Sequence, residues 1–112
     1  MGYSSEYVTT APARAEIDRL PGATVLEFGN AWCGHCRRAE PIVRQALSAS
    51  KLSIRHIRIA DASGKRLGRS YHVKLWPTLI FLREGVEVAR LVRPGTADDV
   101  EVALDALQDE SP

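Results

Sequence analysis

The chain has 112 residues, of which 45% are hydrophobic and 26% charged, and this is the size and balance of a single globular domain. A formal net charge of +1 creates no field that would attract nucleic acid or an anionic membrane surface, so we expect neither as a partner. No apolar run reaches the roughly 20 residues of a membrane span, and the polar start lacks the pattern of a secretory signal, which favours a cytoplasmic protein over a trimmed periplasmic one.

The first quarter of the chain predicts a strand, a helix and a second strand. We expect residues 1–6 to be flexible and residues 7–9 to form a short strand. A helix should begin at Pro12, because proline is tolerated at the first helical position, and should end after Leu20, where Pro-Gly follows. Residues 24–28 are mostly apolar on both faces, which is typical of a buried parallel strand.

The only two cysteines follow this strand closely, in Trp32-Cys33-Gly34-His35-Cys36, and a long helix is predicted over about residues 34–50. A thiol at the first turn of a helix faces outward-pointing N–H groups and the positive end of the helix dipole. At Cys33 this environment stabilises the thiolate, which is the form that attacks disulfides. Cys36 lies one turn further on and within reach, so we expect the pair to cycle between dithiol and disulfide.

Five further elements and a kink are predicted beyond the motif. Pro41 should kink the long helix, since proline removes one helical hydrogen bond. The elements are a strand at 53–59, a short helix within 61–72, a hairpin of strands 78–82 and 86–92, and a helix capped by Thr96 with Val100, Ala103, Leu104 and Leu107 on its apolar face. This order predicts an α/β fold whose mixed sheet is parallel first and antiparallel at one edge, with helices on both faces.

The residues around the cysteines resemble the active-site segment of the thioredoxin family. Residues 25–41 carry the match, with Trp32 before the first cysteine and Pro41 five residues after the second. Farther on, Pro77 resembles the cis-proline that ends a loop in this family, and Gly85 fits its terminal hairpin. The Cys-Gly-His-Cys sequence is similar to that of protein disulfide isomerase domains.

The resemblance extends over about residues 7–109 and implies a thioredoxin fold, with residues 1–112 as one domain. It implies that Cys33 is the nucleophile and that Cys36 resolves the mixed disulfide formed on Cys33. The more reducing members of the family carry proline at the position of His35. We therefore expect a redox potential less negative than that of a typical thioredoxin.

Glu27 is an acidic residue in the middle of a strand that we expect to be buried, which is costly unless the carboxyl group is neutral or paired. The resemblance implies that Glu27 lies beneath the second thiol and exchanges protons with it. The alternative is a glutamate at a strand edge, facing solvent. The family tends to pair this acid with a lysine from the next strand, and here His56 and Arg58 are both candidates.

A set of residues near the thiols is implied to contact an extended substrate segment, and this set is Trp32, Gly34, Trp76 and Pro77. The sequence also departs from the family. Gly29 stands where the family usually has an aromatic residue, and Arg93 stands closest to where it has a glycine. We expect the ring of Trp76 to fill part of the space left by Gly29.

These features predict a thiol–disulfide oxidoreductase that acts on protein disulfides. The expected protein is a monomer with no cofactor beyond the Cys33–Cys36 disulfide, and its partners are disulfide substrates and a recycling reductase or oxidase. One alternative is a non-catalytic adaptor that keeps the fold as a binding module. Another is a zinc site that adds His35 or His72 to the two thiols, but a second cysteine pair is missing, so we expect no metal.

Overall fold

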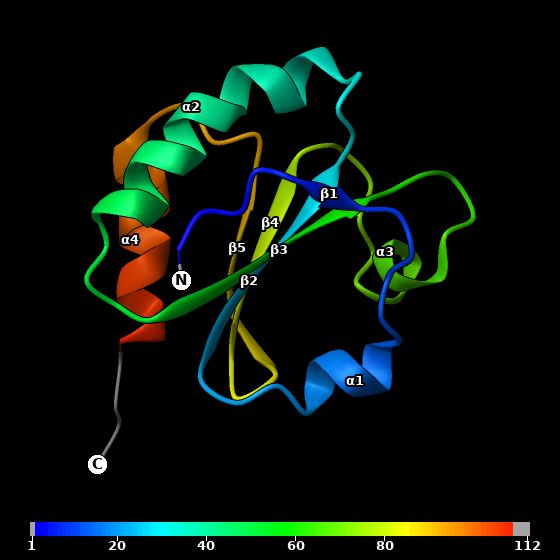
Figure 1. The fold of residues 1–112 in the computed structure, drawn as a ribbon, viewed down its shortest axis with the longest axis horizontal. Coiled ribbons are helices and arrows are strands. Elements are labelled where there is room, and N and C mark those ends of the chain that lie inside the picture. The colour runs from blue at the N-terminus through cyan, green and yellow to red at the C-terminus, as the bar shows by residue number, and fades with distance from the viewer. Residues whose placement is uncertain (1, 109–112) are drawn as a thin grey trace.

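A five-stranded mixed sheet organises residues 2–108, which are the residues that the computed structural model describes (Figure 1). The strands lie in the order β1-β3-β2-β4-β5. Their bounds are Tyr7–Val8 for β1, Ala23–Gly29 for β2, Ile54–Ala60 for β3, Thr78–Arg83 for β4 and Val86–Val92 for β5. β1, β3 and β2 are parallel, β4 is antiparallel to β2, and β5 is antiparallel to β4. The predicted mixed sheet is therefore confirmed.

Helices cover both faces of this sheet, as predicted (Figure 1). Their bounds are Arg14–Asp18 for α1, Gly34–Ala49 for α2, Arg66–Ser70 for α3 and Ala97–Leu107 for α4. α2 and α4 lie against one face, and α1 and α3 lie against the other. Within residues 2–108, no helix combines the length and the apolar character needed to cross a membrane.

The first helix is shorter than the sequence predicts. α1 begins at Arg14, so Pro12 lies outside it. Ala13 is the N-cap, because the carboxylate of Glu16 accepts the N–H of Ala13 at 3.3 Å, while the carbonyl of Ala13 accepts the N–H of Glu16. After Asp18 the chain tightens into i to i+3 hydrogen bonds, and these end the helix two residues earlier than expected.

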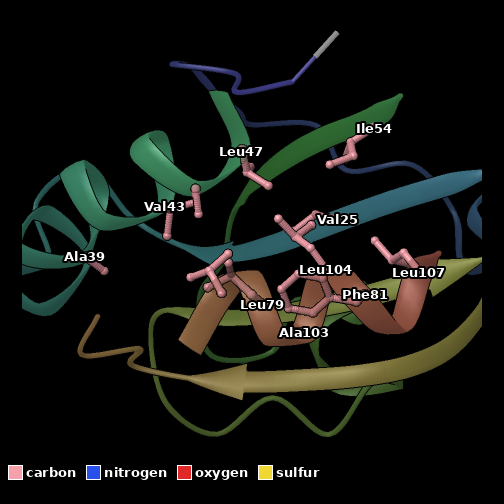
Figure 2. Packing of buried hydrophobic residues seen from close by; sticks show 12 residues of the cluster. Val25, Ala39, Val43, Leu47, Ile54, Leu79, Phe81, Ala103, Leu104 and Leu107 are labelled. Atoms are coloured by element: carbon pink, nitrogen blue, oxygen red, sulfur yellow. The ribbon is translucent and has the colours of Figure 1, made fainter. Parts of the chain in front are cut away.

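The face covered by α2 and α4 carries the larger of two hydrophobic clusters (Figure 2). Its buried side chains come from the sheet and from the inner faces of both helices, and include Val25, Ile54, Leu79, Phe81, Val43, Leu47, Leu104 and Leu107. Thr96 caps α4 as predicted, since its hydroxyl accepts the N–H of Asp99 at 3.2 Å. The cap fixes where α4 begins, and thereby turns its apolar stripe toward the sheet.

The opposite face carries a second cluster beneath α1 and α3. Its buried members are Ile17, Leu26, Phe28, Ile59, Leu67, Tyr71, Ile80 and Leu82. β2 supplies side chains to both clusters, because its successive residues point to opposite faces of the sheet. A strand that is buried on both faces and paired on both edges is held firmly, and β2 is the strand that leads to the two cysteines.

At the end of β2 the chain leaves the sheet and enters α2. The N–H of Asp61 donates to the carbonyl of Gly29 at 2.9 Å, which extends the pairing with β3 to the last residue of β2. The side chain of Asn30 then donates to the carbonyl of Asp61. α2 begins four residues later and runs through Pro41 without a break. The start of α2 is thus anchored to the centre of the sheet.

The residues before β1 are attached to β3. We expected residues 1–6 to be flexible; Met1 lies outside the described residues, and the residues after it make specific contacts. The N–H of Gly2 donates to the carbonyl of Ile54 at 3.1 Å, and the N–H of Ser4 donates to Nδ1 of His56 at 2.8 Å. The carbonyl of Ser5 accepts from the guanidinium of Arg58 at 2.8 Å. This segment therefore covers the side chains of His56 and Arg58.

The hairpin turn gives a test of the fold. Gly85 has a φ of +80°, and a Cβ atom there would overlap the backbone carbonyl of Asp18, whereas Gly64 has a φ of +86° with no atom within 4 Å of such a Cβ. We expect Gly64→Ala to lower the free energy of unfolding by about 1–2 kcal/mol, the conformational cost alone. Gly85→Ala should lose more, over about 2 kcal/mol, because backbone must also move. Urea denaturation measures both, and equal losses would contradict the packing of the hairpin against α1.

Candidate dithiol site

Cys33 occupies the N-cap of α2, directly before the first helical residue. Its backbone is extended, with φ −83° and ψ 122°, and its carbonyl accepts the N–H of Arg37 at 3.0 Å. Cys36 follows one turn into the helix and is buried, whereas Cys33 is partly exposed; both are free thiols. The two sulfurs therefore sit in different environments although only two residues separate them.

The helix start favours the thiolate of Cys33. Burial on its own would raise the pKa of Cys33, but hydrogen bonds from the thiol and the N–H of Cys36 and from the N–H of His35, with the charge of Arg93, bring the pKa below its usual value. The direction agrees with the prediction from the motif. Because the thiolate is the stabilised form, this stabilisation is present above the lowered pKa and is lost as the pH falls through it.

Cys36 behaves in the opposite way. Burial raises the pKa of Cys36 to about 12, and the backbone N–H of Asn30 and the hydroxyl of Tyr7 oppose this rise only in part, while the neighbouring Cys33 adds to it. At neutral pH Cys36 therefore remains a thiol, and Cys33 is the sulfur that ionises more readily. This difference suits an attacking sulfur that is accessible and a second sulfur that reacts only once it has lost its proton.

Glu27 is fully buried at the centre of the sheet, as expected, and both of its candidate partners contact it. Its Oε1 lies 2.9 Å from Nε2 of His56 and 3.4 Å from Nε of Arg58. Arg58 is directly opposite Glu27 in the β2–β3 register, and His56, two residues earlier, points to the same face. The open alternative between His56 and Arg58 is thus answered: the two share one carboxylate oxygen.

The surroundings of this carboxylate fix how its partners are arranged. Because the N–H of Ser4 donates to Nδ1 of His56, Nε2 carries the proton and donates to Glu27. The Arg58 side chain is 1% exposed and reaches outward to Oε2 of Glu40 at 3.2 Å. The second oxygen of Glu27, Oε2, is buried and has no hydrogen-bond partner among residues 2–108. Glu27 can therefore accept one further hydrogen bond or a proton.

Two tryptophans form an apolar wall near the thiols. Trp32 is 70% exposed, and its ring meets that of Trp76 edge to face, with centroids 5.7 Å apart. The peptide bond between Trp76 and Pro77 is cis. Gly34 is the first residue of α2 and is exposed, with no atom within 4 Å of a Cβ placed there. Of these four expected substrate contacts, Trp32 and Gly34 are exposed, Trp76 is partly buried and Pro77 is buried.

The expectation that Trp76 fills the space beside Gly29 is wrong. A Cβ atom at Gly29 would lie 2.6 Å from the sulfur of Cys36 and 3.2 Å from the hydroxyl oxygen of Tyr7. These atoms occupy the space instead, and the indole Nε1 of Trp76 donates to Oδ2 of Asp61 at 2.9 Å. Sequence reasoning missed Tyr7, and the signal that could have found it is the glycine at position 29, which marks a close approach.

Arg93 is the second residue whose place the sequence did not reveal. It adopts a φ of +52°, and its N–H donates to the carbonyl of Pro77 at 2.9 Å. Its side-chain Nε donates to the carbonyl of Trp76 at 2.8 Å. An extended substrate that pairs with the backbone of Trp76 therefore meets a carbonyl that already has a donor, and Arg93 has to yield before that carbonyl can accept from the substrate.

A metal is not suggested by the arrangement of ligating side chains. Within residues 2–108, no group of three or more His, Cys, Asp or Glu side chains is placed to hold a metal ion. The two thiols therefore stand as a pair, with His35 exposed on the first turn of α2 and its backbone N–H directed at Cys33.

Comparisons with known proteins agree with this geometry. A family model described as Thioredoxin matches residues 6–106. The structure of thioredoxin 2 from Pseudomonas aeruginosa PAO1 in its reduced form is 50% identical, covers 94% of this chain and 96% of that chain, and superposes with a TM-score of 0.82. Protein disulfide-isomerase A3 of Gallus gallus is 31% identical over 93 residues, and Thioredoxin H2-1 of Oryza sativa subsp. japonica is 25% identical over 87. These matches cover 83% and 78% of this chain but only 18% and 62% of the two relatives.

The backbone N–H of His35 gives a test of the thiolate environment. His35→Pro removes this donor in the first helical turn, where proline is tolerated. We expect the pKa of Cys33 to rise and the redox potential to become more negative by about 30 mV per pKa unit, because the dithiol state loses stabilisation. Thiolate absorbance and equilibration with glutathione measure the two quantities. His35→Ala keeps the N–H and should shift both less; equal shifts would assign the effect to the imidazole.

The buried ion pair gives a second test. Arg58→Met leaves the carboxylate of Glu27 without its cation, and we expect a loss of about 3–5 kcal/mol in the free energy of unfolding at neutral pH. The double variant that adds Glu27→Gln removes the uncompensated charge and should recover part of this loss. Chemical denaturation of the two single variants and the double variant completes the cycle. Simple additivity of the two losses would show that the pair is not coupled.

Proposed function

Since this chain belongs to the thioredoxin family, we propose that it is a thiol–disulfide oxidoreductase that reduces or exchanges protein disulfides. The observation that carries this proposal is the contrast between the two sulfurs. Cys33 is accessible at the start of α2 with a lowered pKa, and Cys36 is buried beside it with a raised pKa. The sulfur of Cys33 can attack a disulfide, and the sulfur of Cys36 reacts only after it has lost its proton.

In the first step the thiolate of Cys33 attacks one sulfur of a substrate disulfide. A bond forms between Cys33 Sγ and that sulfur, the substrate S–S bond breaks, and the second substrate sulfur leaves as a thiolate that takes up a proton. The lowered pKa of Cys33 increases the fraction of its thiol that is ionised and can make this attack. The N–H groups of His35 and Cys36 that stabilise the thiolate belong to the first turn of α2, so the helix start and the attacking group form one unit.

In the second step Cys36 resolves the mixed disulfide. Its thiol loses a proton, its sulfur attacks Cys33 Sγ, and the bond between Cys33 and the substrate breaks, which releases the reduced substrate and leaves the Cys33–Cys36 disulfide. We assign the proton to Glu27. Its support is a fully buried carboxylate with one oxygen, Oε2, free of hydrogen-bond partners among residues 2–108.

The walls of the site supply contact surface for a polypeptide. The exposed face of Trp32 and the edge of Trp76 offer apolar area beside Cys33. The carbonyl of Trp76 becomes available to an extended segment once the side chain of Arg93 releases it. Gly34 leaves the space above the helix start open. A substrate that presents its disulfide on an accessible loop or strand fits this arrangement.

Proteins of this family act on protein disulfides and are recycled by reductases, and we propose the same cycle here. This chain has His35 where the more reducing members have proline. The redox potential of the Cys33–Cys36 pair decides whether net reduction or exchange dominates. The adaptor alternative gains nothing from the structure, because both thiols and the buried carboxylate of Glu27 remain in place.

The cysteines give the direct test. Cys33→Ser should abolish insulin reduction, since no other thiol is both accessible and lowered in pKa. Cys36→Ser should still attack but should stop at the mixed disulfide, because the resolving sulfur is missing. A turbidity assay measures the first effect, and non-reducing mass spectrometry detects the trapped covalent complex. Wild-type turnover by the Cys33→Ser variant, or no trapping by Cys36→Ser, would remove the basis of the proposed function.

A further inference from the structure

Tyr7 lies beneath the resolving cysteine, although 29 positions separate the two in the sequence. It belongs to the short strand β1, whose parallel register places Tyr7 beside Arg58 of β3. The guanidinium carbon of Arg58 lies 4.1 Å from the centre of the Tyr7 ring. This stacking fixes the plane of the ring, so the direction of the hydroxyl group is set by the sheet.

The hydroxyl reaches the space beside Gly29 that also holds the reacting sulfur. A Cβ atom at Gly29 would lie 3.2 Å from the Tyr7 oxygen and 2.6 Å from Cys36 Sγ, so the glycine leaves room for both. Any larger residue at position 29 would force one of these atoms to move. Gly29, Tyr7 and Cys36 therefore fit together as a set, and the replacement of an aromatic residue by glycine has a structural reason.

The hydroxyl oxygen of Tyr7 is buried and has no hydrogen-bond partner among residues 2–108. A buried hydroxyl without a partner is costly, and such groups are usually retained for a reason. Burial, followed by the charge of Glu27, raises the pKa of Tyr7 well above its usual value, so the group keeps its proton. Tyr7 is therefore a protonated O–H donor close to Cys36, and its hydroxyl lowers the pKa of that thiol.

We propose that Tyr7 is a further catalytic residue of the resolving step, and that its hydroxyl donates a hydrogen bond to Cys36 Sγ as that sulfur becomes a thiolate. This inference rests on the proposed function, because it concerns how the second thiol of the pair is activated. A hydrogen bond to an ionised sulfur is stronger than one to a neutral thiol, so the donor stabilises the thiolate more than the resting state.

The chemistry of the step stays balanced with Tyr7 in this role. The proton of Cys36 goes to Glu27, the bond between Cys36 Sγ and Cys33 Sγ forms, and the bond between Cys33 Sγ and the substrate sulfur breaks. The substrate leaves with the electron pair of that bond and takes up a proton. Tyr7 keeps its own proton throughout, and its hydrogen bond ends when Cys36 enters the disulfide.

Tyr7→Phe tests the proposal, and Tyr3→Phe is its matched control. Tyr3 also has a buried hydroxyl without a partner, and its ring centre lies 5.4 Å from the guanidinium carbon of Arg58, but the atoms nearest to Gly29 do not include it. We expect Tyr7→Phe to slow resolution of a preformed mixed disulfide about tenfold, while attack by Cys33 keeps its wild-type rate. Rapid-quench single-turnover experiments measure both rates.

The pH profile separates this role from a merely structural one. The groups that face Tyr7 and Cys36 are Glu27, Arg58 and Cys33. Loss of the donor should move the rise of the resolution rate to higher pH in Tyr7→Phe, because the thiolate of Cys36 becomes harder to form. Tyr3→Phe should leave the profile where it is.

Three results would overturn the inference: unchanged resolution in Tyr7→Phe, equal slowing in Tyr3→Phe, or an equal loss in attack and resolution. If Tyr7→Phe does not fold, fluorinated tyrosine at position 7 keeps the ring and strengthens the donor, and the pH profile should then move to lower pH; an unmoved profile would contradict the role. The proposed function fails separately, through the Cys33→Ser and Cys36→Ser variants, so the two outcomes remain distinct.

Discussion

The change from β2 to α2 within a few residues is the constraint on which the site depends. β2 is paired on both edges and buried on both faces, so the position of its last residue, Gly29, is fixed by the sheet. Cys33 follows as the N-cap of a 16-residue helix, and the N–H groups of His35 and Cys36 in the first turn of that helix donate to its sulfur. Because Cys36 belongs to the same first turn, it is carried inward and loses contact with solvent. The contrast between the two thiols thus arises from one junction of the backbone.

Beneath this junction lies a group of buried polar side chains on the sheet face that carries α2. Glu27 contacts both His56 and Arg58, and Arg58 continues to Glu40 near the surface. Burying such charges contributes little to stability in itself, and removing one partner is costly. The stability of the pair alone therefore gives little reason to bury these side chains, which supports the proton role proposed for Glu27. Glu27 lies on the side of the sheet that carries α2, the helix whose start holds both cysteines.

Much of this arrangement could be predicted from the sequence, because local patterns determine it. The apolar alternation of the strands, the cap at Thr96 and the turn at Gly85 depend on neighbouring residues, and each is found in the structure. The boundary of α1 was missed since the carboxylate of Glu16 competes with the proline signal. The joint contact of His56 and Arg58 with one oxygen could have been inferred, as residues two apart in a strand share a face. Gly29 signals that some atom approaches closely, but it does not identify Tyr7 as that neighbour, because the position of Tyr7 depends on the pairing of two segments some fifty residues apart.

The attachment of the segment before β1 controls how easily water reaches the buried carboxylate of Glu27. Main-chain groups of Ser4 and Ser5 bind the outer sides of His56 and Arg58, and they shield a carboxylate encoded more than twenty residues later. Displacing this segment, by a fusion or by proteolytic trimming, would hydrate the interior, raise the local permittivity and let the imidazole of His56 change tautomer. The catalytic rate would then depend on whether Ser4 and Ser5 stay attached, although neither residue contacts a sulfur atom. The amino-terminal segment therefore keeps water away from the buried side chains around Glu27.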